Sequence, residues 1–155
     1  REAAHNLMPE SVVQNGLPEA VRRYCEQITK AKDLDIEFQV YGSFSQLDPD
    51  TVITIYRIIQ ELLHNIVKHA KATHAIVQLS LHDHLLSIVL EDNGIGFNPD
   101  EETTGIGLKN LRSRVQRMNG HMTIETASQK DLNAQHSGTT VYLEFDLTTP
   151  KKILT

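Results

Sequence analysis

The chain has one cysteine, Cys25, and no tryptophan, and aromatic residues make up only 5% of it. A lone cysteine cannot form a disulfide within the chain, and this fits a reducing compartment. Because Cys25 lies on the apolar side of a helical pattern, we expect a buried thiol rather than a nucleophile. No apolar run approaches membrane-spanning length, and no secretory signal is present. We therefore expect a cytoplasmic domain without direct membrane contact.

The chain also lacks a basic excess and the motifs of several common sites. Its 15 Lys and Arg residues face 20 Asp and Glu residues, which argues against nucleic acid as the main partner. Neither Gly-x-Gly turn is followed by Gly-Lys-Ser or Gly-Lys-Thr, and Asn110 stands where the dinucleotide fingerprint needs its third glycine. His82 and His84 have no third ligand at a recognisable spacing, so we expect exposed polar residues rather than a metal site.

The most informative sequence pattern in the chain lies in residues 86–111. A short apolar run typical of a buried strand ends in Asp92, and the turn Gly94-Ile95-Gly96 follows. After a short polar loop comes a second turn, Gly105-Ile106-Gly107. Apolar residues then recur with helical spacing, at Leu108, Leu111, Val115 and Met118. The pattern predicts a strand that ends in an acid and a glycine turn, and a second glycine turn that opens a helix.

These features favour a nucleotide pocket. Glycine allows a ligand to approach the backbone closely, and the start of a helix attracts phosphate, here at Gly105 to Leu108. Asp92, at a strand end, is placed to accept a hydrogen bond from a neutral donor such as an exocyclic amine. One Gly-x-Gly alone would be an ordinary turn. Two of them around an acidic strand end indicate a nucleotide site without identifying the nucleotide.

The longest predicted helix carries a second group of polar residues. Asp48 is the expected N-cap and Pro49 the first helical residue. Glu61, Asn65 and Lys68 follow at i, i+4 and i+7, in a row on one face. Such a row fits a solvated surface. It also fits phosphate chemistry, with Asn65 as a Mg²⁺ ligand, Lys68 as a phosphate contact and Glu61 as a base.

The remaining periodicity predicts one two-layer domain. We expect a helix that ends before Pro9, a break at Gly16, and a helix from Pro18 to about Lys32. Alternating apolar residues predict five strands, at residues 36–40, 75–81, 85–90, 122–127 and 141–147. The second and third of these are expected to form a hairpin. Hairpins instead of strict βαβ repeats predict an α+β sandwich, with one mixed, mostly antiparallel sheet and helices on one face.

Four segments resemble the sequence boxes of the GHKL ATPases, a group that includes gyrase and the histidine kinases. Residues 61–70 (Glu-Leu-Leu-His-Asn-Ile-Val-Lys-His-Ala) are similar to the N box, and residues 92–97 to the first glycine box. Residues 105–108 resemble the second glycine box, and residues 138–141 the closing Gly-Thr strand. All four occur in family order, and the resemblance implies a Bergerat-type ATPase fold.

Within that group the chain is most similar to the catalytic domain of sensor histidine kinases, in the nitrate-sensor-like branch. Residues 56–61 and 110–115 carry this likeness, as does the short segment between the glycine boxes. Residues 1–17 resemble the end of a dimerisation helix and its linker, residues 18–149 the ATP-binding catalytic domain, and residues 150–155 a C-terminal tail. Since the chain opens on Arg1, we expect it to be a piece of a longer protein.

The resemblance implies roles for individual residues. Asp92 would bind the adenine amino group, with Thr139 supporting it through water. Asn65 would hold Mg²⁺, Glu61 would be the base, and Gly105 and Gly107 would let a lid close over the phosphates. The ATP-binding positions that it implies are Asn65, Lys68, His69, Asp92, Gly94, Gly96, Gly105, Ile106, Gly107, Leu108 and Thr139.

It also implies the reaction and the partners. The γ-phosphate of ATP would pass to a histidine on the dimerisation helices of a homodimer, and then to an aspartate of a response regulator. His5 precedes Asn6 and lies where the second of those helices should end, so we expect the acceptor to be absent from this chain. The full protein would be cytoplasmic or membrane-anchored with this part in the cytoplasm. The alternative is an anti-sigma-factor serine kinase, which would not be expected to carry the linker pattern of residues 1–17.

Overall fold

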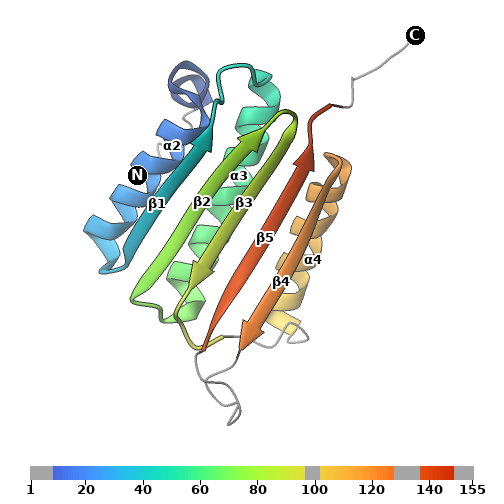
Figure 1. The fold of residues 1–155 in the computed structure, drawn as a ribbon. Helices are drawn as coiled ribbons and strands as arrows, with labels where there is room; N and C mark the ends of the chain where they lie inside the picture. Colours follow the sequence, from blue (N-terminus) through green and yellow to red (C-terminus); the bar gives the residue numbers. More distant parts are fainter. Residues whose placement is uncertain (1–8, 97–101, 128–136, 149–155) are drawn as a thin grey trace.

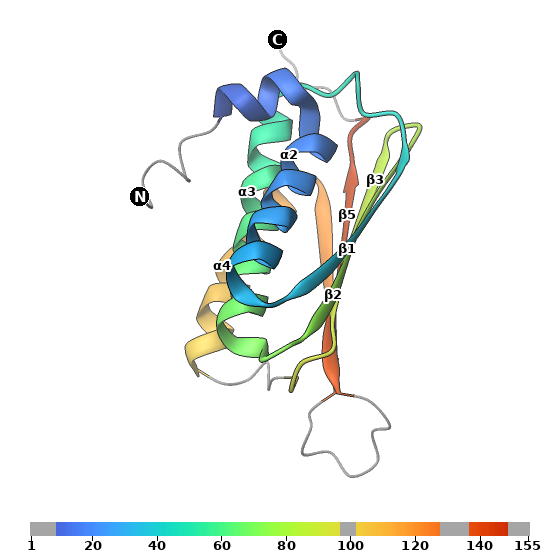
Figure 2. The same ribbon diagram turned by 90° about the vertical axis from the view of Figure 1, so that its left-hand side faces the viewer.

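The computed structural model describes residues 9–96, 102–127 and 137–148. Within them, five strands form one sheet, and the helices lie together on one of its faces (Figures 1 and 2). The strands are β1 (Asp35–Gly42), β2 (His74–His82), β3 (Leu85–Asp92), β4 (Gly120–Ala127) and β5 (Gly138–Asp146). The helices are α2 (Pro9–Lys32), α3 (Pro49–Asn65), the π-helical turn η1 (Ile66–Ala70) and α4 (Glu102–Arg117).

The sheet is mixed and mostly antiparallel. Its strand order is β1-β2-β3-β5-β4, with β1 and β2 parallel and the other neighbours antiparallel. The predicted α+β sandwich with helices on one face is therefore confirmed. The order also places the end of β3 beside the start of β5, where Asp92 pairs with Thr139 although about fifty residues separate them in the sequence.

Alternation along the strands builds the core. On β2 and β3 every second residue is buried, and the inward residues pair across the sheet, as Val77 does with Leu90 and Leu79 with Ile88. The inward residues of β5, including Leu143 and Phe145, are fully buried beneath the helices. The other face of the sheet carries the polar residues of the same alternation, which is typical of a sheet covered on one side.

The central helix α3 begins as predicted. The Asp48 side chain accepts a hydrogen bond from the Thr51 amide at 3.2 Å, and Pro49 occupies the first turn, where no amide donor is needed. Its apolar stripe faces the sheet, with Ile55, Ile59 and Leu63 fully buried. Cys25 of α2 is also buried, as predicted, and burial raises the pKa of its thiol to about 12.

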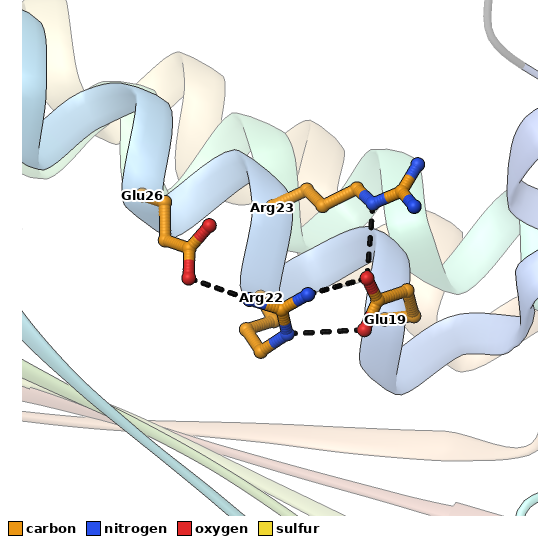
Figure 3. A network of polar contacts seen from close by, with 4 residues as sticks. All are labelled: Glu19, Arg22, Arg23 and Glu26. Carbon is orange, nitrogen blue, oxygen red and sulfur yellow. Dashed lines mark hydrogen bonds and ion pairs between the residues drawn. The ribbon is translucent and has the colours of Figure 1, made fainter.

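Helix α2 differs from the prediction at one end. We expected the helix to begin at Pro18, but the chain is already helical from Pro9 onward. The expected end of an earlier helix before Pro9 lies outside the described residues. A proline in the first turn removes a donor that has no partner there, so it begins a helix as readily as it follows one. The predicted break at Gly16 is present as a kink with φ 86° and ψ 164°. On the solvent side of α2, Arg22 pairs with Glu19 and Glu26, and Arg23 pairs with Glu19 (Figure 3).

Two other helix ends also differ. The row that we predicted to continue from Glu61 through Asn65 to Lys68 is interrupted, because α3 ends at Asn65 and η1 follows with a wider turn. This turn ends at Lys71, which has left-handed φ/ψ angles of 52° and 39°. Helix α4, which we expected to open at the second glycine turn, already begins at Glu102. An acidic residue suits the positive end of a helix, and nothing at residues 102–104 prevents helical φ/ψ angles.

Candidate nucleotide-binding site

A hollow opens between the end of α3 and the first half of α4, above β3 and β5. It encloses about 760 Å³ of empty space, counted with the open solvent at its mouth. Its apolar lining comes from Leu62, Ile66, Ala70, Leu90 and Val141. Its polar and backbone lining comes from Asn65, His69, Asp92, Gly96, Gly107, Leu108 and Thr139.

Asp92 ends β3 inside this hollow. It is 7% exposed, and its Oδ1 accepts a hydrogen bond from the Gly94 amide at 2.8 Å. Burial raises the pKa of the Asp92 carboxyl above its ordinary value, while hydrogen bonds from the Gly94 and Thr139 backbones oppose that rise. The result is a buried acceptor whose orientation the backbone sets, suited to a neutral amine donor.

Thr139 lies next to it, opposite Asp92 in the register of β3 and β5. It is 8% exposed, and its hydroxyl lies 3.0 Å from that of Thr126 in β4. The Thr126 hydroxyl also lies 3.3 Å from the Gly138 carbonyl oxygen, to which it can donate. Among the described residues, Asp92 and Thr139 are the polar residues that the fold buries, and both face the hollow.

The first glycine turn is held by contacts to the end of η1. The Ile95 amide donates to the Ala70 carbonyl at 2.8 Å. A Cβ added to Gly94 would lie 2.1 Å from that same carbonyl oxygen, so only glycine allows this approach. The Asn93 side chain accepts from the Thr73 and His74 amides at 2.9 and 3.0 Å. Gly94 therefore acts by placing Asp92 and Gly96 and does not itself line the hollow.

The second glycine turn lies inside α4. A Cβ added to Gly107 would meet nothing within 4 Å, so protein packing does not require a glycine at this position. Gly107 and Leu108 line the hollow. Gly105 and Ile106 directly precede Gly107 in the same helix, and their side chains fall outside the described residues.

The long helix contributes less than its sequence suggested. Asn65 and His69 line the hollow, whereas Lys68 is exposed and is not among the lining residues. Glu61 is not a lining residue either. Its Oε1 accepts a hydrogen bond from Nη2 of Arg114 in α4 at 2.7 Å.

Several contributors were not predicted from the sequence. The apolar residues that line the hollow follow the same sequence periodicity as the other core residues. No sequence signal therefore distinguishes Leu62, Ile66, Leu90 or Val141 from core residues that do not line it. Thr126 contacts Thr139 from the neighbouring strand, and Arg114 contacts Glu61 from the neighbouring helix. Their partners lie 13 and 53 residues away in the sequence, and neither motif spacing nor periodicity reports such pairs.

Comparison with known proteins decides what kind of site this is. The profile of the histidine kinase-, DNA gyrase B- and HSP90-like ATPases matches residues 50–149, which is more than half of the chain and holds the whole hollow. The chain belongs to this ATPase family. The expected family resemblance is confirmed, and residues 50–149 include the acid, the glycine turns and the closing Gly-Thr strand on which it was based.

Individual relatives place the domain more narrowly. It is 31% identical to the sensor histidine kinase ComP of Bacillus subtilis over 137 residues, covering 86% of this chain and 18% of ComP. It is 29% identical over 150 residues to the oxygen sensor histidine kinase NreB of Staphylococcus carnosus, covering 96% of this chain and 41% of NreB. The chain therefore spans less than half the length of these two relatives.

Solved structures support the same fold. The histidine kinase domain of the blue-light activated kinase of Erythrobacter litoralis superimposes with a TM-score of 0.63 at 21% identity, covering 84% of this chain and 65% of that one. AdeS of Acinetobacter baumannii gives a TM-score of 0.64 at 16% identity, covering 94% and 77%. The chain is the ATP-binding catalytic domain of a histidine kinase. Among its described residues, no helix is both long and apolar enough to cross a membrane.

Proposed function

We propose that this domain binds ATP with Mg²⁺ and transfers the γ-phosphate to a histidine on a dimerisation helix pair, for relay to an aspartate of a response regulator. The observation that carries the proposal is the buried Asp92–Thr139 pair, which opens into a hollow between α3 and α4. The names of ComP and NreB, both sensor histidine kinases, support a histidine as acceptor. A response regulator as partner and a homodimer as the full assembly are part of the same proposal.

The adenine end of the nucleotide is proposed to lie over β3 and β5. The ionised Asp92 carboxylate accepts hydrogen bonds only, so it matches the amino group of adenine and not the carbonyl of guanine. The apolar side chains of Ile66, Leu90 and Val141 offer surfaces for the faces of the base. Thr139, held by the Thr126 hydroxyl, supplies a second polar contact through water.

The phosphate end is proposed to lie between Asn65 and the second glycine turn. The Asn65 side-chain oxygen is a neutral hard ligand, suited to a Mg²⁺ ion that also binds phosphate oxygens. Since packing does not require a glycine at position 107, close approach of a phosphate is a sufficient reason for one. Because α4 begins at Glu102, its free amide groups lie before Gly105, and phosphate contacts are assigned to the glycines rather than to a helix start.

The catalytic role is assigned to Glu61. It lies one helical turn before Asn65, so its carboxylate is close to the phosphate end without lining the adenine pocket. A base in that place acts on the incoming nucleophile and not on bound nucleotide. Lys68 and His69 of η1 are proposed to contribute positive charge and polar contacts to the phosphates.

The test is calorimetric titration of the chain with ATP, GTP and adenosine, with and without Mg²⁺. We expect ATP to bind more tightly than GTP, adenosine to bind without needing Mg²⁺, and Mg²⁺ to strengthen ATP binding. Transfer is then measured with γ-labelled ATP and a histidine-bearing helix pair supplied on a separate chain. Equal affinity for ATP and GTP would contradict the adenine assignment, and labelled serine in place of histidine would support the anti-sigma-factor kinase.

A further inference from the structure

Arg114 of α4 is joined to Glu61 of α3 beside the nucleotide site. Its Nη2 donates to Glu61 Oε1 at 2.7 Å, and the two helices lie next to each other on the covered face of the sheet (Figure 1). Arg114 is not among the residues that line the hollow. Its described polar contact is therefore with the proposed base and not with the space that the nucleotide would fill.

The position of the pair relative to the walls is informative. Glu61 lies one turn before Asn65 on α3, and Arg114 lies six residues after Leu108 on α4. Asn65 and Leu108 line the hollow from α3 and α4, respectively. The ion pair thus connects the two wall helices just beyond the site, where it holds the Glu61 carboxylate toward α4.

The arginine is more constrained than an ordinary surface residue. Its side chain and that of Glu61 are 40% and 41% exposed, yet Arg114 Nε is buried and has no hydrogen-bond acceptor among the described residues. A buried donor without an acceptor costs stability, whereas a solvated guanidinium would keep all of its donors in water. In the observed arrangement the Nε donor has no acceptor, while the Nη2 donor orients the Glu61 carboxylate.

Other cations near these helices make no such contact. Arg57 lies one turn before Glu61 on α3 and is exposed. Arg112, two residues before Arg114, donates to the Met122 carbonyl of β4 at 3.4 Å. Among the described residues, Arg114 is the cation with a recorded contact to the Glu61 carboxylate.

We propose that Arg114 is a positioning residue that acts through Glu61, holding its carboxylate in the orientation needed to take a proton from the acceptor histidine. A base that is itself oriented by a third group is a recurring arrangement in transfer reactions. The inference rests on the proposed function, since it assumes that Glu61 is the base. It assigns no direct contact between Arg114 and the nucleotide.

The test is a double-mutant cycle on transfer of label from γ-labelled ATP to a supplied histidine-bearing helix pair. The variants are Glu61→Gln, Arg114→Gln and the two together, with Arg114→Lys as the conservative change. Arg112→Gln is the matched control, because it removes an arginine from the same helix that contacts β4 instead of Glu61. ATP affinity is measured by calorimetry for every variant.

We expect Arg114→Gln to lower the transfer rate about tenfold or more, up to the roughly 10²–10⁴-fold that a base contributes, and to change ATP affinity by less than about twofold. In the double variant, Arg114→Gln should not lower the transfer rate below that of Glu61→Gln alone, because the effects of residues that act as a unit are not additive. Arg114→Lys should keep most of the rate, since a single donor is used, and Arg112→Gln should be unaffected. These four results together would support the inference.

Other outcomes would overturn it. Additive losses in the double variant, or equal losses of affinity and rate, would make Arg114 a phosphate ligand or a purely structural residue. A rate that falls with Glu61→Gln but not with Arg114→Gln would defeat this inference alone and leave the proposed function standing. Transfer that is unchanged by Glu61→Gln, or absent from the unaltered chain, would defeat the base assignment or the proposed function, and this inference with it.

Discussion

Asp92 and Thr139 lie opposite each other in neighbouring antiparallel strands, and each is less than a tenth exposed. Burying polar side chains costs free energy unless they are hydrogen-bonded. The Gly94 amide satisfies one Asp92 oxygen, and Thr126 lies in hydrogen-bond range of Thr139. Because both side chains line the hollow, a ligand amino group there can donate a hydrogen bond to the Asp92 carboxylate, and this is the physical reason for the first prediction.

Replacing Asp92 with Asn should weaken ATP binding by roughly ten- to a hundredfold. An amide can turn its NH₂ toward the adenine amino group, so that two donors face each other, and an unmatched buried polar pair costs about 1–3 kcal/mol. Calorimetry with ATP and with adenosine should show similar losses for both, since the defect lies at the base. Asp146→Asn, at the exposed far end of β5, is the control and should bind normally. Unchanged affinity in Asp92→Asn would remove Asp92 from the site.

The same change should have the opposite effect on the stability of the free domain. Burial raises the folded-state pKa of Asp92 above its ordinary 3.8, so ionisation above that pH destabilises the fold. Asn cannot ionise, and Asp92→Asn should therefore be at least as stable as the unaltered domain at pH 7. This advantage should disappear as the pH falls to about 4 and below, where both forms are neutral.

Asp146→Asn gives the matched comparison for the stability measurement. Hydrogen bonds from Thr148 lower the pKa of Asp146, so its ionised form stabilises the fold at neutral pH and that contribution is lost on acidification. Thermal midpoints measured from pH 3.5 to 8 should therefore move in opposite directions for the two variants at neutral pH. Destabilisation of Asp92→Asn at pH 7 would show that the hydrogen bonds to its carboxylate outweigh the cost of burial.

Two glycine substitutions should separate folding from binding. Gly94→Ala places a Cβ 2.1 Å from the Ala70 carbonyl oxygen, so the turn must move, and we expect a loss of about 1–3 kcal/mol in the free energy of unfolding. Gly107→Ala meets nothing within 4 Å in α4 and should be neutral or stabilising by roughly 0.5–1 kcal/mol, as for alanine in a helix. Denaturant unfolding measures both.

ATP titration of the same pair completes the test. Gly94→Ala should bind ATP weakly because Asp92 is displaced with the turn. Gly107→Ala should also bind ATP weakly, although it folds normally, because its methyl group occupies the approach to the phosphates. Normal ATP affinity in Gly107→Ala would show that the phosphates do not come close to this part of α4.

The chain incubated alone with γ-labelled ATP should bind nucleotide and remain unlabelled. The reason is the expectation that the phosphoacceptor histidine is absent from it, His5 being in the wrong context. His5 lies outside the described residues, so only the experiment decides this point. Acid-labile label recovered on His5 in stoichiometric amount would reverse the assignment.

The sequence alone determined most of the local structure. The Asp48–Pro49 cap, the kink at Gly16 and the hairpin around Asp83 were predictable because each depends on residues close together in the chain. Asp83 takes φ 55° in that turn, a conformation that aspartate tolerates better than most residues. The ATPase family was also readable, since its boxes are local in sequence.

Tertiary structure decided what those local signals become. The wider π-helical turn after Asn65 carries Lys68 out of the row that helical spacing predicted, and such a turn has no reliable sequence signature. The sequence pointed to Gly94 only as an ATP-binding position, whereas the structure shows that the Ala70 carbonyl, from another element, also requires a glycine there. Glu61 meets Arg114 only because α3 and α4 are brought side by side across 53 residues of chain. Contacts of this kind depend on how whole elements pack, and periodicity along a single element carries no information about its neighbours.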